Sequence, residues 1–264
     1  MSESAADASY PTPNFSIDLS GQVAFVTGTT SGLGRRFADV LAACGAKVAI
    51  SGRRADRLAE HAAELRARGT EVAVVQLDMT DSQAVKDSVA TVEKQLGPIT
   101  ILVNNAGIPD AQRAHKMSLD LIDRVIDTNL RGPYVLSCEV ASRLIELKLP
   151  GRMVNLSSIA YRNYSGNGAA LYSTTKAAIA RMTEALAVEW ARNRINVNAI
   201  APGAFHSEMM DGMVERIGDI AAHFPRKRIC DPALMDSTLL YLVSPASEAV
   251  TGVIIEIDDG QGPR

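Results

Sequence analysis

The sequence lacks any apolar run that approaches the roughly 18 residues of a membrane-spanning helix. Its first residues also lack the basic start and the apolar core of a signal peptide. Cysteine is scarce, since Cys44, Cys138 and Cys230 are odd in number, far apart and outside any pairing motif. These absences favour reduced thiols with packing roles, and we expect a cytoplasmic protein with no membrane partner.

An excess of either charge is absent as well. The 27 basic and 30 acidic residues give a formal net charge of −3, which does not favour nucleic acid as a partner. The one tight basic run, Arg226-Lys227-Arg228, is interpreted as a solvated surface near the substrate side, with phosphate binding as the alternative. The histidines show neither HExxH nor mixed Cys/His spacing, and we predict no metal site.

Short β-branched runs alternate with helical patterns along the chain, and no Pro/Ser/Gly-rich linker interrupts the interior. This alternation predicts an α/β fold, a doubly wound parallel sheet of seven strands with helices on both faces. We expect a mobile N-terminal tail over residues 1–16 and a single domain over 17–264. Strands are expected at 22–27, 47–51, 71–77, 99–104, 152–156, 196–200 and 253–257. Helices are expected at 34–44, 55–68, 81–96, 118–148, 171–192, 207–222 and 232–243.

The first strand and helix enclose a glycine-rich turn that predicts a nucleotide site. The run Thr27-Gly28-Thr29-Thr30-Ser31-Gly32-Leu33-Gly34 follows an apolar segment and precedes a helical pattern. Glycine lets the backbone approach a diphosphate, whose charge then lies at the helix N-terminus. The spacing is GxxxGxG rather than GxGxxG, and a turn without a ligand is the alternative. Cofactor contacts are expected at Gly28, Ser31, Gly32, Leu33 and Gly34.

The segment Tyr172-Ser173-Thr174-Thr175-Lys176 places a phenol and an ammonium group one helical turn apart, on one helix face. The pKa of a free tyrosine, about 10, is too high for acid–base chemistry at neutral pH. A cation held against the phenol favours the phenolate, so we expect Lys176 to lower the pKa of Tyr172. The alternative is a packed tyrosine beside a solvated lysine.

With the motifs between them, these two segments resemble the short-chain dehydrogenase/reductase family over roughly residues 18–260. The motifs occur in the family's order. They are the glycine turn, Asn104-Asn105-Ala106-Gly107, Asp127-Thr128-Asn129-Leu130, Asn155-Leu156-Ser157-Ser158, Tyr172 with Lys176, and Pro202-Gly203. The resemblance implies a Rossmann-type fold and an NAD(P)-dependent enzyme that acts on CH–OH groups.

The resemblance also implies the catalytic residues. Tyr172 would be the acid/base, Lys176 would bind the nicotinamide ribose, and Asn129 would hold a water. For Asn129, a structural role in kinking its helix is an equal alternative. The family's spacing places its serine at Ile159, one residue after Ser158. We therefore choose Ser158 as the catalytic serine, with Ser157 as the alternative, and expect the loop 161–168 to hold the extra residue.

The end of the second strand predicts the cofactor. In dinucleotide folds that take NAD, an acid there binds the ribose hydroxyls, but this chain has Arg53 and Arg54. The guanidinium of Arg53 suits a 2′-phosphate, so we predict NADP(H), with NAD(H) as the alternative. Both arginines could instead begin the next helix and face water, and Asp78 could be a helix N-cap. Further cofactor contacts implied by the resemblance are Asp78, Met79, Asn105, Ala106, Gly107, Tyr172, Lys176, Pro202, Gly203, Phe205 and Ser207.

These features predict an NADP(H)-dependent oxidoreductase that interconverts a secondary alcohol and a ketone of a small-molecule substrate. The alternatives are a 3-oxoacyl thioester reductase or a sugar/polyol dehydrogenase of the same family, and a non-catalytic dinucleotide-binding regulator. Met209, Met210, Met213 and Ile217 suggest an apolar lid over the substrate, although core packing explains them equally well.

The expected helices at 118–148 and 171–192 are rich in apolar residues, and one sheet covers only one face of each. In the family these two helices pack against a twofold-related partner, and a second interface completes a tetramer. We expect a homotetramer, with a dimer as the alternative. The apolar residues concerned are Leu119, Leu121, Ile122, Val125, Ile126, Val135, Leu136, Ala178, Ile179, Met182, Leu186 and Trp190.

Overall fold

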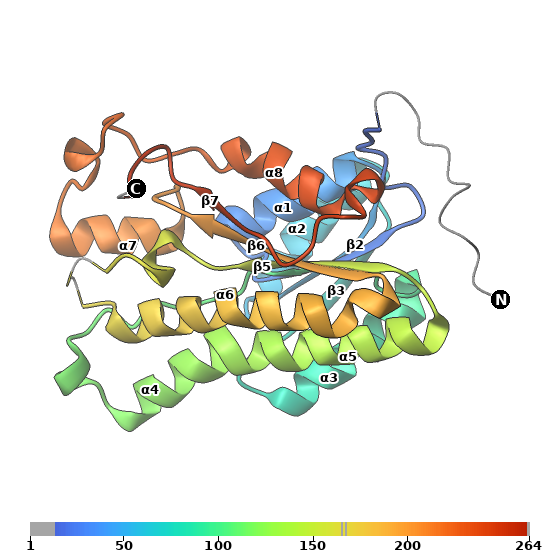
Figure 1. Cartoon of the computed structure of the whole chain (residues 1–264), viewed down its shortest axis with the longest axis horizontal. Coiled ribbons are helices and arrows are strands. Elements are labelled where there is room, and N and C mark those ends of the chain that lie inside the picture. Colours follow the sequence, from blue (N-terminus) through green and yellow to red (C-terminus); the bar gives the residue numbers. More distant parts are fainter. Residues whose placement is uncertain (1–13, 165, 167, 263–264) are drawn as a thin grey trace.

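The computed structural model describes residues 14–164, 166 and 168–262, so most of the predicted tail lies outside the described range. Seven parallel strands form one sheet in the order β3-β2-β1-β4-β5-β6-β7 (Figure 1), which confirms the predicted fold class. The order reverses between β1 and β4, the point at which ligands bind in such sheets. The strands are β1 Val23–Thr27, β2 Lys47–Gly52, β3 Val72–Gln76, β4 Ile101–Asn104, β5 Gly151–Leu156, β6 Ile195–Pro202 and β7 Ile254–Ile257.

Helices cover both faces of the sheet, with α3, α5 and α6 on one face and α1, α2 and α8 on the other (Figure 1). Because successive side chains of a strand point to opposite faces, each central strand supplies both cores. In β1, Phe25 packs with the first group of helices, and Ala24 and Val26 pack with the second. The α-helices are α1 Gly32–Ala43, α2 Ala55–Ala67, α3 Ser82–Leu96, α4 Leu119–Ile126, α5 Gly132–Leu147, α6 Ala170–Trp190, α7 Glu208–Ile217 and α8 Asp236–Val243.

Three of the expected helices differ from the structure. The helix predicted over 232–243 begins only at Asp236, because Pro232–Met235 forms a 3₁₀ turn. The helix predicted over 118–148 is divided into α4 and α5 by a π-helical segment, Asp127–Arg131. Since Pro133 has no N–H, the carbonyl of Asn129 lacks its usual donor four residues on, which is compatible with the widened turn. The helix predicted over 207–222 ends at Ile217, because Gly218 follows with a φ of 85° and stops it.

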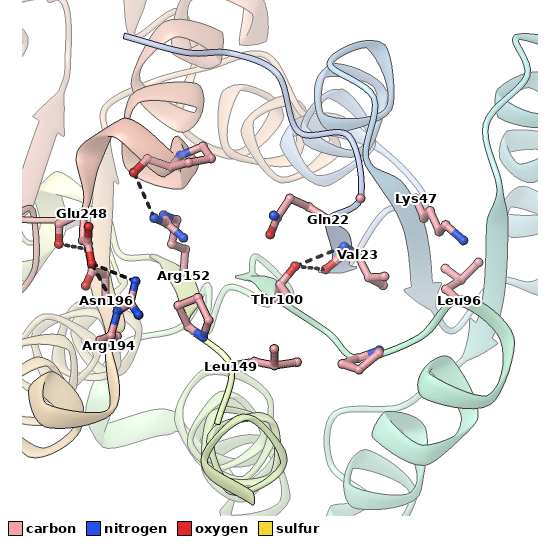
Figure 2. A pocket seen from close by; sticks show the side chains of 14 residues that line it. Gln22, Val23, Lys47, Leu96, Thr100, Leu149, Arg152, Arg194, Asn196 and Glu248 are labelled. Carbon is pink, nitrogen blue, oxygen red and sulfur yellow. Dashed lines mark hydrogen bonds and ion pairs between the residues drawn. The ribbon is translucent and has the colours of Figure 1, made fainter. Parts of the chain in front are cut away.

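The two ends of the sheet are shaped differently. At the amino ends of the strands lies a hollow of about 680 Å³, which Figure 2 shows from close by. Val23, Lys47, Arg152 and Asn196 line it, each at or near the first residue of its strand. The motifs identified in the sequence lie at the opposite end, where β1, β4, β5 and β6 run into the turns that follow them.

Candidate active site

The turn between β1 and α1 is built around glycines. Gly28 has a φ of 72°, and a Cβ atom on it would lie 2.9 Å from the Cα of Ala106. A Cβ atom on Gly34 would lie 2.3 Å from the carbonyl oxygen of Gly28. The Ser31 side chain does not cap α1, and the first N–H groups of a helix have no partners within the helix. The shape of this turn is compatible with the diphosphate of a dinucleotide, and the cofactor contacts of Gly28 to Gly34 stay a prediction.

The segment after β4 holds the glycine turn in place. The N–H groups of Asn105 and Ala106 both donate to the Thr27 hydroxyl at 3.0 Å. The Asn105 side chain donates to the carbonyls of Thr27 and Gly28, at 2.8 and 3.1 Å. At Gly107, a Cβ atom would lie 3.6 Å from the Lys176 ammonium nitrogen. The NNAG backbone thus runs from the predicted cofactor turn to the predicted catalytic lysine.

Tyr172 and Lys176 lie in the first two turns of α6, beside the end of β5. The Lys176 Nζ lies 5.5 Å from the centre of the Tyr172 ring and donates to the carbonyl of Leu156 at 2.6 Å. The Ser158 side chain lies close enough to the Tyr172 phenol to lower its pKa. A substrate oxygen that approaches the phenol would therefore also meet the Ser158 hydroxyl.

Ser157 faces a different group. Its buried hydroxyl donates to the backbone carbonyl of Lys176 at 2.8 Å and so ties β5 to α6. The Ser158 side chain also accepts from the N–H of Ala160, at 3.2 Å. This geometry favours Ser158 as the serine that contacts substrate, with a structural role for Ser157.

The pKa directions differ from what the sequence suggested. Burial raises the pKa of Tyr172, the nearby Ser158 side chain acts in the opposite direction, and the charge of Asp110 raises it again. Burial lowers the pKa of Lys176, whose side chain is 4% exposed, to about 8. The expectation that Lys176 lowers the pKa of Tyr172 is therefore wrong for the protein without a bound cofactor. Burial in a site with little water disfavours both the phenolate of Tyr172 and the ammonium of Lys176. The phenol is protonated at neutral pH and can act as a proton donor.

Asn129 lies in the π-helical segment between α4 and α5. Its side-chain carbonyl accepts from the N–H of Ile108 at 2.8 Å, and its amide donates to the Ile108 carbonyl at 2.9 Å. The same amide donates to the Thr175 hydroxyl at 3.3 Å. Asn129 thus joins the widened turn to α6 and to the segment after β4, which supports the structural alternative; its role toward a water stays a prediction.

At the end of β2, the second of the two arginines reaches the glycine turn. Arg54 donates to the hydroxyls of Thr30 and Ser31, at 2.7 and 3.2 Å, and pairs with Glu208 at 3.0 Å. Arg53 is exposed, and only its backbone carbonyl has a hydrogen-bond partner, Gln76, among the described residues. Of the two arginines, the sequence favoured Arg53, whereas in the structure Arg54 is the one that hydrogen-bonds the turn.

After β3, the predicted cofactor contacts Asp78 and Met79 lie on different sides of the backbone. Asp78 is exposed and accepts from the N–H and hydroxyl of Thr80, at 3.0 and 2.9 Å. The N-cap of α3 is Asp81, which accepts from two N–H groups of the first turn, so the N-cap interpretation of Asp78 is wrong. Met79 is buried, and a Cβ atom on Gly132 would lie 2.6 Å from its carbonyl oxygen.

The segment after β6 brings α7 onto the glycine turn. Pro202 ends β6, and the N–H of Gly203 donates to the Ile257 carbonyl at 2.9 Å. Phe205 is buried, and Ser207 caps α7 by accepting from the N–H of Met210 at 3.2 Å. A Cβ atom on Gly32 would lie 3.1 Å from the Cβ of Ser207. The start of α7 therefore lies against the predicted diphosphate site.

The residues after α7 are tied to the C-terminal turn. Arg226 and Arg228 each pair with Asp259 at 2.8 Å, so the basic run does more than face water. These arginines, Arg228 first, lower the pKa of Asp259 to about 2. In α7 itself, Met209 is 37% exposed, which excludes core packing as its explanation; the suggested lid stays a prediction.

Asp110 is a site residue that sequence reasoning missed. It lies six residues after the end of β4, and its buried carboxylate accepts from the N–H groups of Leu171 and Tyr172. No period or motif marks this loop aspartate, because its partners lie about 60 residues further along the chain.

Within 14–164, 166 and 168–262, no three His, Cys, Asp or Glu side chains gather as metal ligands would. The same residues include no helix long and apolar enough to cross a membrane. Cys44, Cys138 and Cys230 are free thiols.

Known proteins resemble this chain over most of its length. A gluconate 5-dehydrogenase of Gluconobacter oxydans is 33% identical, covering 92% of this chain and 95% of that protein. An acetoacetyl-CoA reductase of Shinella zoogloeoides is 37% identical, covering 91% and 98%. Among solved structures, a variant of actinorhodin polyketide ketoreductase with NADPH superposes with a TM-score of 0.87, at 31% identity, covering 92% and 98%.

A family model described as short chain dehydrogenase matches residues 22–217. The match extends from the glycine turn through Tyr172 and Lys176 to α7. The chain therefore belongs to the short-chain dehydrogenase family and is an oxidoreductase of alcohol and carbonyl groups.

Proposed function

We propose that this protein is an NADP(H)-dependent oxidoreductase that interconverts a secondary alcohol and a ketone, with Tyr172 as the acid/base. The observation that carries the proposal is the position of the Lys176 ammonium nitrogen, 5.5 Å from the centre of the Tyr172 ring, with the Ser158 side chain close to the phenol. This group lies at the carboxyl end of the sheet and is connected through Gly107 and the segment after β4 to a turn that fits a dinucleotide.

Each residue then has a defined task. The bound nicotinamide supplies or takes the hydride. In reduction, Tyr172 donates its proton to the carbonyl oxygen, and the Ser158 hydroxyl hydrogen-bonds the same oxygen as charge develops on it. In oxidation, the phenol must first lose its proton, and the phenolate then takes the proton of the alcohol as the hydride leaves.

NADP(H) is the proposed cofactor because the end of β2 carries two arginines and no carboxylate. Arg53 is exposed there, and Arg54 lies across the hydroxyls of the glycine turn. A guanidinium binds a 2′-phosphate through charge-assisted hydrogen bonds. The similar polyketide ketoreductase was solved with NADPH, which is consistent with this choice. NAD(H) is the alternative.

The substrate class stays open between two candidates of the same family. The similarity to a gluconate 5-dehydrogenase favours a sugar acid or polyol, and the similarity to an acetoacetyl-CoA reductase favours a 3-oxoacyl thioester. A non-catalytic regulator is disfavoured, because Ser158, Tyr172 and Lys176 are all present. The test is a panel of keto sugar acids, simple ketones and 3-oxoacyl thioesters, with oxidation of NADPH and NADH followed by absorbance. Turnover with no member of the panel would contradict the proposed reaction.

We also propose that residues 17–264 act as one catalytic domain in a cytoplasmic homotetramer. Most of the apolar residues named for α5 and α6 are buried within the chain, Leu136 and Leu186 among them. Leu119 on α4 and Val188 on α6 remain 76% and 81% exposed, and a partner subunit packed against these helices would cover such apolar side chains. Light scattering after size exclusion tests this, and an active monomer of 28.1 kDa would contradict it.

A further inference from the structure

The helix that carries Tyr172 and Lys176 has no cap of its own. The residue at its N-cap position is Ala169, which has no side-chain oxygen for the N–H groups of the first turn. Asp110, which lies in the segment after β4, caps the helix instead. One oxygen of its carboxylate accepts from the N–H groups of Leu171 and Tyr172, at 2.9 and 3.2 Å.

Asp110 is only 3% exposed, although charged side chains are rarely buried without a partner. Its second oxygen accepts from the N–H of Ala111 at 2.9 Å. The carboxylate is therefore held by three backbone N–H groups and by the positive end of α6. One of those N–H groups belongs to Tyr172 itself.

The backbone around Asp110 is fixed from both sides. Ala111 has a φ of 51°, a left-handed conformation that costs free energy for a residue other than glycine. Arg113 donates to the carbonyl of Gly166 at 3.0 Å, in the loop that precedes α6. Upstream, Ile108 is bonded twice to Asn129. The segment 107–113 thus forms a strap across the start of α6.

The carboxylate also acts on the phenol by its charge. The groups that face Tyr172 are Lys176 on its own helix, Ser158 from the end of β5, and Asp110 from the strap. Of these, Asp110 raises the pKa of the phenol, and the Ser158 side chain lowers it.

We propose that Asp110 is a positioning residue of the reaction, whose buried carboxylate caps α6 through the backbone of Tyr172 and sets a fixed negative charge beside the phenol. This inference rests on the proposed role of Tyr172 as acid/base. It assigns two separable effects to one side chain. The hydrogen bonds fix where the phenol lies, and the charge favours the protonated phenol that ketone reduction requires.

Two substitutions separate these effects. Asp110→Asn removes the charge and keeps one carbonyl oxygen as acceptor, whereas Asp110→Ala removes both. For Asp110→Asn, the pH at which the rate of ketone reduction falls should move to a lower value than in the parent. For Asp110→Ala, kcat should also fall, by about 100-fold, since small misplacements of a reacting group have effects of this size. Asp81→Asn is the matched control, because Asp81 caps α3 in the same way without facing Tyr172.

Two further readouts do not depend on turnover. Amide hydrogen exchange at Leu171 and Tyr172 should be faster in Asp110→Ala than in the parent, and unchanged in Asp81→Asn. The ultraviolet titration of the phenol, taken as the difference from Tyr172→Phe, should move to lower pH in Asp110→Asn. These two measurements test Asp110 even if no substrate is turned over. Unchanged exchange together with an unchanged phenol titration would overturn the proposal.

Discussion

The two ends of the sheet contain similar side chains but use them differently. At the carboxyl end, Ser158, Tyr172 and Lys176 converge on one point beside a glycine turn. At the amino end, the hollow of about 680 Å³ is lined by polar side chains that bond to one another or to nearby backbone carbonyls (Figure 2). Arg194 pairs with Glu248 at 3.3 Å, for example.

The partners of each polar group explain the difference. Arg152 donates to the carbonyls of Ser244 and Pro245, and Asn196 donates to those of Ser247 and Glu248. These bonds join the strand ends to the loop before β7. The phenol of Tyr172, in contrast, lies beside the side chains of Ser158 and Lys176, which can both act on a substrate oxygen at the phenol. The direction in which polar groups point marks the site better than the size of a hollow does.

The largest effect should come from removing the Tyr172 hydroxyl. Tyr172→Phe should lower kcat by about 100- to 10,000-fold, the contribution typical of a positioned acid or base. Cofactor affinity should change little, since the hydroxyl acts mainly in the transition state. Steady-state rates and fluorescence titration with NADPH measure the two quantities.

Lys176→Ala is the comparison for this variant, and it should impair both turnover and cofactor binding. If Tyr172→Phe kept a rate within roughly tenfold of the parent, another group would have to transfer the proton.

A smaller effect should separate the two serines at the end of β5. Ser158→Ala should lower kcat by about 100-fold, because it removes a donor to the developing oxyanion. Ser157→Ala removes the bond to the Lys176 carbonyl and should cost about 1 kcal/mol of unfolding free energy, with a much smaller loss of kcat. Kinetics together with thermal unfolding of both variants decide the order. A larger kcat loss for Ser157→Ala would transfer the catalytic role to that residue.

Substitution of the predicted cofactor contacts should have an effect of intermediate size, and it should change cofactor affinity only. NADPH should bind more tightly than NADH, and Arg53→Asp or Arg54→Ala should raise the Kd for NADPH by about tenfold or more, as expected for a lost charge-assisted hydrogen bond. Lys47→Ala, which removes a cation at the amino end, is the control and should leave both affinities unchanged. Equal affinities of the parent for NADPH and NADH would refute the NADP(H) assignment.

The strands and the glycine turn could be predicted from the sequence because their signals are local. The apolar run before Gly28 and the periodicity around Tyr172 are each contained in about 20 residues. The apolar pattern continues through the π-helical segment Asp127–Arg131, so periodicity did not divide the expected helix, although the kink proposed at Asn129 and the nearby Pro133 lie at this turn. Asp78 and Asp81 carry the same N-cap signal three residues apart, and sequence alone could not choose between them.

The remaining site residues depend on contacts between distant segments. Asp110 bonds to residues 61 and 62 positions away, and Arg54 pairs with Glu208 at a separation of 154. The direction of the Tyr172 pKa also depends on burial by the surrounding elements. A motif names the groups that do the chemistry, but the dielectric surroundings of those groups are a property of the assembled fold.

The smallest effects should come from the hollow at the amino end. Arg194→Ala breaks a pair whose side chains are 67% and 54% exposed, and it should cost less than about 1 kcal/mol of unfolding free energy. Arg152→Met should cost more, about 1–3 kcal/mol, since it leaves the carbonyls of Ser244 and Pro245 without these donors. Neither variant should change kcat/KM by more than about twofold, because the sites are distant from the phenol and share no partner with it. Thermal unfolding and steady-state kinetics on both variants measure this. A tenfold loss of kcat/KM in a folded Arg152→Met protein would show that the amino end takes part in the reaction, and the contrast between the two ends of the sheet would no longer hold.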